Sequence, residues 1–505
     1  MNNYYITTPI YYVNDVPHIG SAYTTLACDV IARFMRLSGK EVKFLTGTDE
    51  HGQKVEKAAT NAGISPKDFT DKMSLRFREL CEVMNFSNDD FIRTTEPRHI
   101  NAAQALWKKL QDNGAIYLGS YDGWYSVRDE AFYNESELTE DGLAPTGAPV
   151  EWVSEPSYFF ALSKWQDRLL EFYDQNPDFL KPVSRRNEVV SFVKSGLNDL
   201  SISRTSFKWG IPVPQDESHI MYVWLDALTN YLSALGYPED TDDMKKFWPA
   251  NVHVIGKDIT RFHAVYWPAF LMAADLPIPQ TIMAHGWWTN DGQKISKSLG
   301  NTIDPIALVK EFGLDQVRYF LMREVIFGND GNYSRSQLIA RINNELANKI
   351  GNLSQRTLSF VVKECGGVPS GNIDAAYSEE LLICASQLLE SMTAAINKYD
   401  ISTALNLVLQ LADMANVYID KEAPWTLKKT DQNKMQEVLY VLMEAIRYIG
   451  LALQPFMPNS ASLMLDQLGV SQNERAFSCM SKAYALKPGS VLLAPTPVFP
   501  RAQEV

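Results

Sequence analysis

The first sixty residues contain apolar patterns typical of strands and helices in alternation. Residues 5–8, rich in β-branched and aromatic side chains, predict a strand, and residues 41–45 predict a second one. Between them, residues 22–37 place their apolar side chains on one face of a helix, and helical spacing resumes at Lys54. This order indicates an α/β fold with a doubly wound, Rossmann-like parallel sheet, in which ligands bind at the carboxyl ends of strands.

The sheet pattern is interrupted and then returns. Residues 116–214 are rich in glycine, aromatic and acidic residues and predict an insertion, although residues 157–173 have helical spacing. The parallel-sheet pattern resumes at 222–227 and continues with strands at 252–255 and 281–286. The insertion therefore divides the predicted nucleotide-binding domain into two halves.

The last third of the chain has a different pattern. From about residue 338 the spacing is helical, as at 433–453, which predicts a helical bundle followed by an extended tail at 491–498. We therefore expect four ranges: the first half of the α/β domain (1–115), the insertion (116–214), the second half of the α/β domain with the loop at 294–301 (215–337), and the all-α domain (338–505).

Composition limits the class of protein. A chain of 505 residues is too long for one core and predicts two to four domains. The net charge of −13 argues against indiscriminate binding to nucleic acid or to anionic membranes. Neither a signal peptide nor an apolar run of about 20 residues is present, so we expect no membrane association. The five scattered cysteines form no C-x-x-C pair, which suits a cytoplasmic protein without a disulfide framework or a zinc ribbon.

Two segments carry candidate chemistry for phosphate. His18, Gly20 and Ser21 stand between a predicted strand and a helix N-terminus, where free N–H groups and the helix dipole favour an anion. Lys294 and Lys297, in a loop with two serines, can neutralise a polyphosphate. Taken separately, an ordinary loop histidine and a solvated surface loop are the more frequent explanations of such segments.

Asp49 follows the second predicted strand, so it and His18 are expected to face one site. The alternative for Asp49 is a helix N-cap with polar neighbours, and the two interpretations weigh equally from the sequence. Aromatic residues near the strand ends suit an apolar, flexible thioether ligand, because sulfur–aromatic contacts are favourable. Ordinary core packing explains the same aromatics.

Eight segments together resemble the class I aminoacyl-tRNA synthetases, and within them the methionyl-tRNA synthetases. They are PHIGSAY (17–23), TGTDEHGQK (46–54), YVWLDAL (222–228), VIGKDI (254–259), AHGWW (284–288), KISKSLGN (294–301), NKIGNLSQR (348–356) and KEAPWTL (421–427). The resemblance implies ATP-dependent activation of L-methionine to an adenylate and its transfer to tRNA(Met), for protein synthesis including initiation. Mg²⁺ is expected on the ATP phosphates.

The resemblance also assigns residues. Catalytic roles fall to His18, which would stabilise charge on the α-phosphate, and to Lys294 and Lys297, which would hold pyrophosphate. ATP binding falls to His18, Gly20, Ser21, Gly256, Asp258 and Lys297. The methionine pocket would contain Ile10, Tyr12, Asp49, Trp224, Leu228, Tyr231 and His285. Two positions depart from the family pattern: Ser21 stands where a second histidine is frequent, and Leu228 where some relatives have proline.

The predicted bundle is expected to bind the anticodon. Asn352 and Arg356 are four residues apart and share a helix face, and Trp425 would stack on an unpaired base. The alternative for Trp425 is a core residue at a helix start. A basic surface despite the acidic net charge is expected from Lys349, Arg356, Lys363, Lys421, Lys428, Lys429 and Lys434.

Many relatives carry a zinc knuckle with paired cysteines in the insertion. No cysteine lies between Cys81 and Cys365, so we expect no zinc. No dimerisation domain is evident after the bundle, so we expect a monomer. Two alternatives remain: a synthetase for another apolar amino acid, and a non-catalytic RNA-binding relative. The intact signature residues argue against the second alternative.

Overall fold

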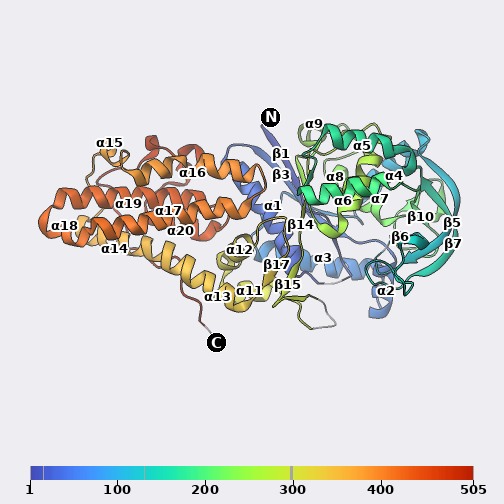
Figure 1. The fold of residues 1–505 in the computed structure, drawn as a ribbon, viewed down its shortest axis with the longest axis horizontal. Helices are drawn as coiled ribbons and strands as arrows, with labels where there is room; N and C mark the ends of the chain where they lie inside the picture. Colours follow the sequence, from blue (N-terminus) through green and yellow to red (C-terminus); the bar gives the residue numbers. More distant parts are fainter. Residues whose placement is uncertain (1, 15, 130, 296–299, 504–505) are drawn as a thin grey trace.

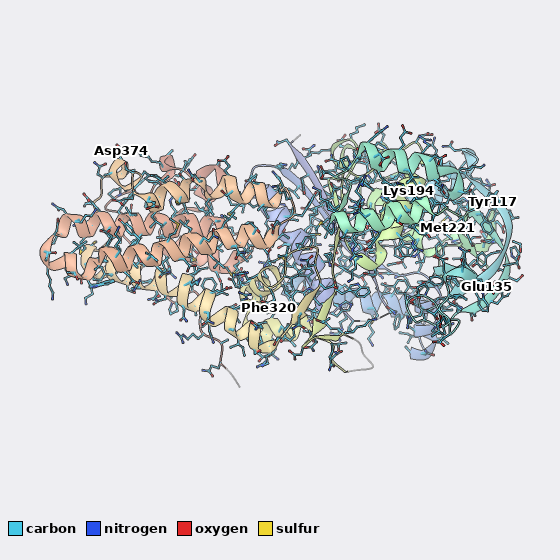
Figure 2. All side chains as sticks on the ribbon, viewed as in Figure 1. Tyr117, Glu135, Lys194, Met221, Phe320 and Asp374 are labelled. Carbon is cyan, nitrogen blue, oxygen red and sulfur yellow. The ribbon has the colours of Figure 1, made fainter. Side chains whose placement is uncertain are left out.

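The structure is a computed structural model that describes residues 2–14, 16–129, 131–295 and 300–503. Figure 1 shows an elongated molecule with an α/β part, coloured blue to yellow-green, and a helical bundle, coloured orange to red, at its opposite end. Tyr117 and Glu135 lie at the end away from the bundle, and Asp374 lies at the bundle end (Figure 2).

A seven-stranded sheet forms the centre of the α/β part. Its strands pair in the order β2-β3-β1-β13-β14-β8, β4 pairs with β3, and every pairing is parallel. The strands are β1 (Asn3–Thr7), β2 (Tyr11–Tyr12), β3 (Glu41–Asp49), β4 (Asp90–Arg93), β8 (Leu180–Lys181), β13 (Val252–Gly256) and β14 (Ile282–His285). The predicted parallel-sheet fold is confirmed. The edge strand β8 lies within the range expected as an insertion. The sequence pattern did not indicate a strand of the central sheet there.

Helices pack around this sheet. They are α1 (Ile19–Leu37), α2 (Gln53–Ala62), α3 (Pro66–Val83), α4 (Pro97–Asp112), α10 (Trp267–Ala273), α11 (Pro305–Phe312) and α12 (Leu314–Arg323). The helix α1 was expected over residues 22–37 and begins three residues earlier, because His18 and Ser21 cap it. Nearly all of its side chains are buried, so it forms part of the core under the sheet.

The insertion contains a four-stranded antiparallel sheet with the order β6-β5-β7-β9. Its elements are β5 (Ile116–Ser126), β6 (Ala131–Tyr133), η1 (Glu135–Glu137), β7 (Glu151–Phe160), η2 (Leu162–Trp165), α5 (Gln166–Gln175), α6 (Val183–Lys194) and β9 (Leu200–Ser201). The helix expected over residues 157–173 is wrong in its first part. Residues 157–160 complete β7, where Ser157 bonds to Ser201 and Phe160 packs on Phe270, so tertiary contacts override the helical spacing.

The parallel strand expected at 222–227 is also wrong. These residues form the buried helix α7 (Val223–Leu228), which follows β12 (Asp216–Met221); β12 pairs antiparallel with β10 (Ser203–Arg204) and β11 (Pro212–Val213). A short apolar run does not distinguish a buried strand from a buried helix. After α7 come α8 (Asn230–Ser233) and α9 (Asp242–Phe247).

Short elements complete the region near the strand ends. The one-turn helix η3 (Lys257–Ile259) and the π-helix η4 (Phe262–Tyr266) follow β13. A small sheet with the order β16-β15-β17 is formed by β15 (Trp288–Asn290), β16 (Gln293–Lys294) and β17 (Gly331–Tyr333). Lys294 ends β16, immediately before the segment that contains Lys297, which lies outside the described residues.

The predicted helical bundle is confirmed. It comprises α13 (Arg335–Arg341), the π-helix η6 (Ile342–Gly351), α14 (Asn352–Cys365), α15 (Ile373–Ala376), α16 (Glu380–Ile396), α17 (Ile401–Glu422), α18 (Pro424–Thr430), α19 (Gln432–Leu453) and α20 (Pro458–Gln467), followed by the short turns η7 (Gln472–Glu474), η8 (Phe477–Cys479) and η9 (Lys482–Tyr484). In the expected extended tail, Val491 makes an isolated bridge with Gly367, and the rest pairs in no described strand.

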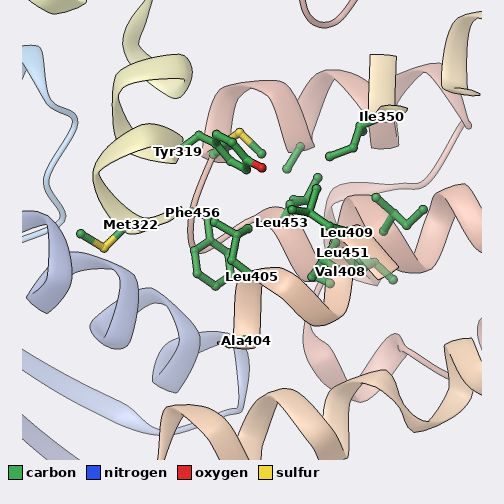
Figure 3. Close-up of a cluster of buried hydrophobic side chains, with 14 of the residues drawn as sticks. Tyr319, Met322, Ile350, Ala404, Leu405, Val408, Leu409, Leu451, Leu453 and Phe456 are labelled. Carbon is green, nitrogen blue, oxygen red and sulfur yellow. The ribbon is translucent and has the colours of Figure 1, made fainter. Parts of the chain in front are cut away.

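The core is continuous between the two parts. Tyr319 and Met322 of α12 belong to the same cluster of buried hydrophobic side chains as Leu405, Val408 and Phe456 of the bundle (Figure 3). Burial of apolar area stabilises this contact. The bundle therefore packs against the α/β part and is not joined to it by the chain connection alone. Within the described residues, no helix is both long enough and apolar enough to cross a membrane.

Candidate active site

A cavity of about 1250 Å³ lies at the carboxyl ends of the central strands. Parallel strands present these ends at one edge of a sheet, which is why residues distant in sequence meet there. The predicted residues that line it are Ile10, Tyr12, His18, Gly20, Ser21, Asp49, Trp224, Leu228, Tyr231, Gly256, Asp258, His285 and Lys294. The remaining predicted residue, Lys297, lies outside the described residues.

His18 and Ser21 form a capping box at the start of α1. The Nδ1 atom of His18 accepts a hydrogen bond from the N–H of Gly20 at 3.0 Å. The hydroxyl of Ser21 accepts one from the N–H of His18 at 3.0 Å and donates one to the His18 carbonyl at 2.8 Å. The hydroxyl of Ser21 is therefore engaged with the backbone that carries His18.

This cap fixes how the imidazole is presented. Because Nδ1 of His18 accepts a hydrogen bond, Nε2 is the ring atom that can donate to a ligand. A Cβ atom on Gly20 would lie 2.9 Å from Cε1 and 3.0 Å from Nδ1 of His18. Gly20 is therefore needed to leave space for the imidazole beside the helix N-terminus.

Gly256 ends β13, and Asp258 follows it in η3. A Cβ atom on Gly256 would lie 2.6 Å from Oδ1 of Asp258, so glycine leaves room for this carboxylate. The same oxygen accepts a hydrogen bond from Nε1 of Trp287 at 3.0 Å. Asp258 is exposed in the cavity wall with a fixed orientation.

Trp287 belongs to the segment AHGWW (284–288), but the sequence predicted no role for it. Two cations lie over its ring, with Nζ of Lys257 at 4.4 Å and Nζ of Lys294 at 5.8 Å from the centroid. Lys257 also pairs with both oxygens of Asp330, at 2.7 and 2.8 Å. The side chain of Trp287 is 47% exposed, and an exposed tryptophan at a strand end is the signal that could have identified it.

The other side of the cavity is aromatic. Trp224 stacks on Phe262, with ring centroids 3.7 Å apart and an angle of 7° between the rings. The hydroxyl of Tyr231 bonds to Nε2 of His263 at 2.7 Å, and its ring stacks on His253 at 3.9 Å. Phe262 was not predicted, because nothing in a helical pattern shows which aromatic side chain faces a ligand.

Buried histidines surround this aromatic wall. Nε2 of His285 bonds to Thr24 at 2.7 Å, and Nδ1 bonds to the Gly286 carbonyl at 2.8 Å. Burial lowers the pKa of His285, and it lowers the pKa of His263 to about 4. These imidazoles are therefore neutral hydrogen-bonding groups at neutral pH.

Comparison with known proteins identifies the family. The family described as tRNA synthetases class I (M) matches residues 4–145 and 144–358, and the anticodon binding domain of methionyl tRNA ligase matches residues 368–504. The methionine–tRNA ligase of Rickettsia felis is 66% identical over 504 residues, which are 99% of this chain and 98% of that protein. The chain belongs to the methionyl-tRNA synthetase family. The resemblance inferred from the sequence motifs is confirmed.

Other methionyl-tRNA synthetases agree with this assignment. The methionine–tRNA ligase of Brucella suis is 54% identical over 99% of this chain and 98% of its own length. The structure of the Mycobacterium tuberculosis methionyl-tRNA synthetase in complex with methionyl-adenylate superposes with a TM-score of 0.96, at 49% identity, over 99% of this chain and 100% of that one.

The second candidate site of this synthetase lies on the bundle. The guanidinium of Arg356 lies 5.8 Å from the ring centroid of Trp425 and pairs with Asp420 at 3.0 Å. Asn352 is exposed one turn earlier on the same helix. Trp425 is 44% exposed, so it is not the core residue that the alternative interpretation required.

The expected basic surface of the synthetase is partly neutralised by carboxylates. Lys349 pairs with Asp413 at 2.7 Å, and Lys428 pairs with Glu364 at 2.7 Å. Lys434 lies 3.8 Å from Glu379. The lysines are therefore embedded in mixed charge, and an anionic partner has to compete with these acids.

Among the described residues, no group of three or more histidine, cysteine, aspartate or glutamate side chains is placed to hold a metal ion. In the insertion, the Asp129 carboxylate instead accepts hydrogen bonds from the hydroxyls of Tyr133, at 3.1 Å, and Thr146.

Proposed function

We propose that this chain activates L-methionine with ATP to form methionyl-adenylate and then transfers the methionyl group to tRNA(Met), supplying protein synthesis and its initiation. The observation that carries the proposal is the single cavity at the sheet edge. One end of it presents a histidine at a helix N-terminus, and the other end is an aromatic pocket with a carboxylate. A relative of the same fold holds methionyl-adenylate.

The phosphate end acts by electrostatics. The Nε2–H of His18 and the N-terminus of α1 donate to the α-phosphate as negative charge builds in the transition state. Ser21 contributes by holding His18, and Gly20 by leaving it space. Asp258, oriented by Trp287, accepts hydrogen bonds from the ribose hydroxyls, and Gly256 admits the ribose.

Lys294 and Lys297 neutralise the departing pyrophosphate. Lys294 lies in the cavity wall near Trp287, which supports its place at the phosphate end. Mg²⁺ would enter with ATP as part of the substrate and would help to neutralise the phosphate charge. We expect no zinc requirement.

The amino-acid end selects by shape and charge. Asp49 pairs with the ammonium group of methionine, while Ile10, Tyr12, Trp224, Leu228, Tyr231 and His285 enclose its side chain. Phe262 joins this set because it supports the ring of Trp224. The polarisable thioether gains sulfur–aromatic contacts of about 0.3–1.5 kcal/mol each.

The bundle reads the anticodon. Exposed Trp425 offers a stacking face for an unpaired base, and Asn352 and Arg356 offer hydrogen-bond donors beside it. The catalytic domain in this scheme is residues 1–115 with 215–337, split by the insertion at 116–214, and the anticodon-binding domain is 338–505. Both sites are built from this one chain, which supports a monomer, and the scattered thiols suit the cytoplasm.

Amino-acid-dependent pyrophosphate exchange tests the proposal. We expect exchange with methionine far above that with leucine, isoleucine or valine, and charging of tRNA(Met) by the same preparation. Preferred activation of another amino acid would refute the substrate assignment. His18→Ala should lower kcat by about 100-fold or more, since one preorganised donor in a transition state contributes about that much.

A further inference from the structure

A buried chain of hydrogen bonds lies behind the amino-acid pocket. Oδ2 of Asp226 bonds to Nδ1 of His51 at 2.7 Å, and Oδ1 bonds to Nε2 of His99 at 2.7 Å. Nδ1 of His99 continues the chain to the hydroxyl of Ser233 at 2.9 Å. Asp226 and His99 are fully buried. His51, His99 and Asp226 are not among the described residues that line the cavity.

These bonds join three separate segments of the fold. His51 stands two residues after Asp49 in the loop that follows β3, His99 is on α4, and Asp226 is on α7. The carbonyl of His51 also accepts a hydrogen bond from the hydroxyl of Tyr12 at 2.8 Å. Through this carbonyl, the chain of bonds also reaches Tyr12 in the pocket wall.

The helix α7 and its continuation α8 carry the opposite wall of the pocket. Trp224 and Leu228 flank Asp226 on α7, and Tyr231 is on α8 beside Ser233. We propose that His51, Asp226 and His99 act as a clamp that holds the wall bearing Trp224 at a set separation from Asp49 and Tyr12. They are positioning residues for methionine, and the inference rests on the proposed amino-acid site.

Burial and paired hydrogen bonds fix the geometry of the clamp. Burial disfavours the charged carboxylate, but the two imidazoles overcome it and hold the pKa of Asp226 at about 2. A buried carboxylate paired on both oxygens has strong geometric preferences, because losing either partner leaves charge uncompensated. Trp209 covers His51 edge-on at 5.5 Å and bonds to the neighbouring Glu50 carbonyl at 2.6 Å, which limits rotation of this loop.

The ATP end of the cavity depends on other contacts. His18 is held by the cap of α1, and Asp258 by Trp287, and no hydrogen bond described in the structure joins either of them to the clamp. Loosening the clamp should therefore displace the methionine wall and leave the nucleotide end in place. A merely structural network would instead affect both substrates, or only the amount of folded enzyme.

Paired substitutions test the clamp. The amide of asparagine can replace the Nδ1–H donor of His51, and that of glutamine the Nε2–H donor of His99, whereas leucine replaces neither. In pyrophosphate exchange, normalised to active sites titrated by adenylate formation, we expect His51→Leu and His99→Leu to raise the KM for methionine by about 10- to 100-fold, which is the cost of a small displacement of a binding group. The KM for ATP should stay within about twofold.

The conservative variants decide between positioning and simple stability. His51→Asn and His99→Gln should have a methionine KM close to that of the unmodified enzyme. An unchanged methionine KM in the leucine variants, or equal increases for both substrates, would overturn the proposal. If the leucine variants do not fold, Ser233→Ala replaces them: it removes the terminal partner of His99, and we expect a rise of a few-fold in the methionine KM alone, while no rise would overturn the clamp.

Two further variants separate this inference from the function on which it rests. Asp49→Ala and Trp224→Ala should raise the methionine KM because both residues line the pocket. If they do not, the amino-acid site itself is wrongly assigned. If they do and the clamp variants do not, only the clamp is refuted.

Discussion

Ser21 holds His18 through the backbone: its hydroxyl accepts from the His18 N–H at 3.0 Å and donates to the His18 carbonyl at 2.8 Å. The position at which relatives frequently have a second histidine therefore has a definite task in this chain. It closes the first turn of α1 and so fixes the backbone from which the His18 imidazole extends.

Ser21→Ala tests this task. Loss of a helix cap costs about 1 kcal/mol of stability, and it frees the His18 backbone to fray. We expect kcat for adenylate formation to fall about 5- to 20-fold, with little change in the KM for methionine. Ser21→Thr keeps the hydroxyl and should retain most of the activity. Full activity in the alanine variant would show that the cap does not orient His18.

Gly20→Ala should be more harmful to catalysis than to folding. The new Cβ atom would lie 2.9 Å from Cε1 of His18 and would push the imidazole out of its position. Alanine is a better helix residue than glycine by about 1 kcal/mol, so the melting temperature should not fall. Pyrophosphate exchange at saturating substrate measures kcat, which we expect to drop about as far as in His18→Ala. An active Gly20→Ala enzyme would contradict this packing argument.

Phe262→Leu should weaken methionine binding without affecting ATP. The parallel stack of Phe262 on Trp224 keeps the indole against the cavity, and aromatic pairs contribute about 0.5–1.5 kcal/mol beyond their buried area. The expected rise in methionine KM is therefore about two- to tenfold. Phe172→Leu in α5, where the ring of Phe172 pairs with Phe179 and neither residue lines the cavity, is the matched control and should leave both KM values unchanged.

Stability should fall as the pH is lowered from about 6.5 to about 4. Burial lowers the pKa of His263 to about 4, so in this window the unfolded chain binds a proton that the folded chain does not. The loss reaches about 3 kcal/mol for this one group. Burial lowers the pKa of His253 and His285 too, which adds in the same direction.

Urea midpoints at pH 7.5 and 5 measure this effect. His263→Gln can still accept the Tyr231 hydroxyl and does not titrate, so we expect its midpoint to change less between the two values. An identical pH dependence in the wild-type chain and in this variant would show that His263 does not control the slope.

Arg318 should be among the most sensitive positions for stability. Its buried guanidinium bonds to Asp29 of α1 at 2.7 Å, to the Met84 carbonyl at 3.0 Å, and to the carbonyls of Pro455 and Phe456 in the bundle at 3.0 and 2.8 Å. Arg318→Met should cost about 3–5 kcal/mol, because buried partners lose their donor. Arg335→Met removes an exposed pair with Glu311 and should cost far less stability than Arg318→Met, because solvent screens that pair.

The Arg318 variant should also separate the two half-reactions. If the variant weakens the contact between the bundle and α12, the KM for tRNA in aminoacylation should rise more than the KM for methionine or for ATP in pyrophosphate exchange. Equal effects on both assays would indicate general destabilisation only.

The positions of Asp49, Gly256 and His285 could be predicted from the chain alone. Each stands at or just after the end of a run that the sequence predicts as a strand, and parallel strands bring their carboxyl ends to one edge. The helical spacing after residue 338 likewise suffices to predict the bundle. The family followed from spaced motifs, because eight matching segments in order do not arise by chance.

The side-chain partners were decided by the tertiary structure. Asp226 bonds to residues 175 and 127 positions away in the sequence, and Trp287 bonds to a carboxylate 29 positions away. The segment around Asp226 looked like a strand, since a short apolar run has no period by which to distinguish a helix. Local pattern determines which residues are buried and which elements end near the site. Which polar groups then meet depends on how those elements pack, because a buried donor must find an acceptor wherever the fold places one.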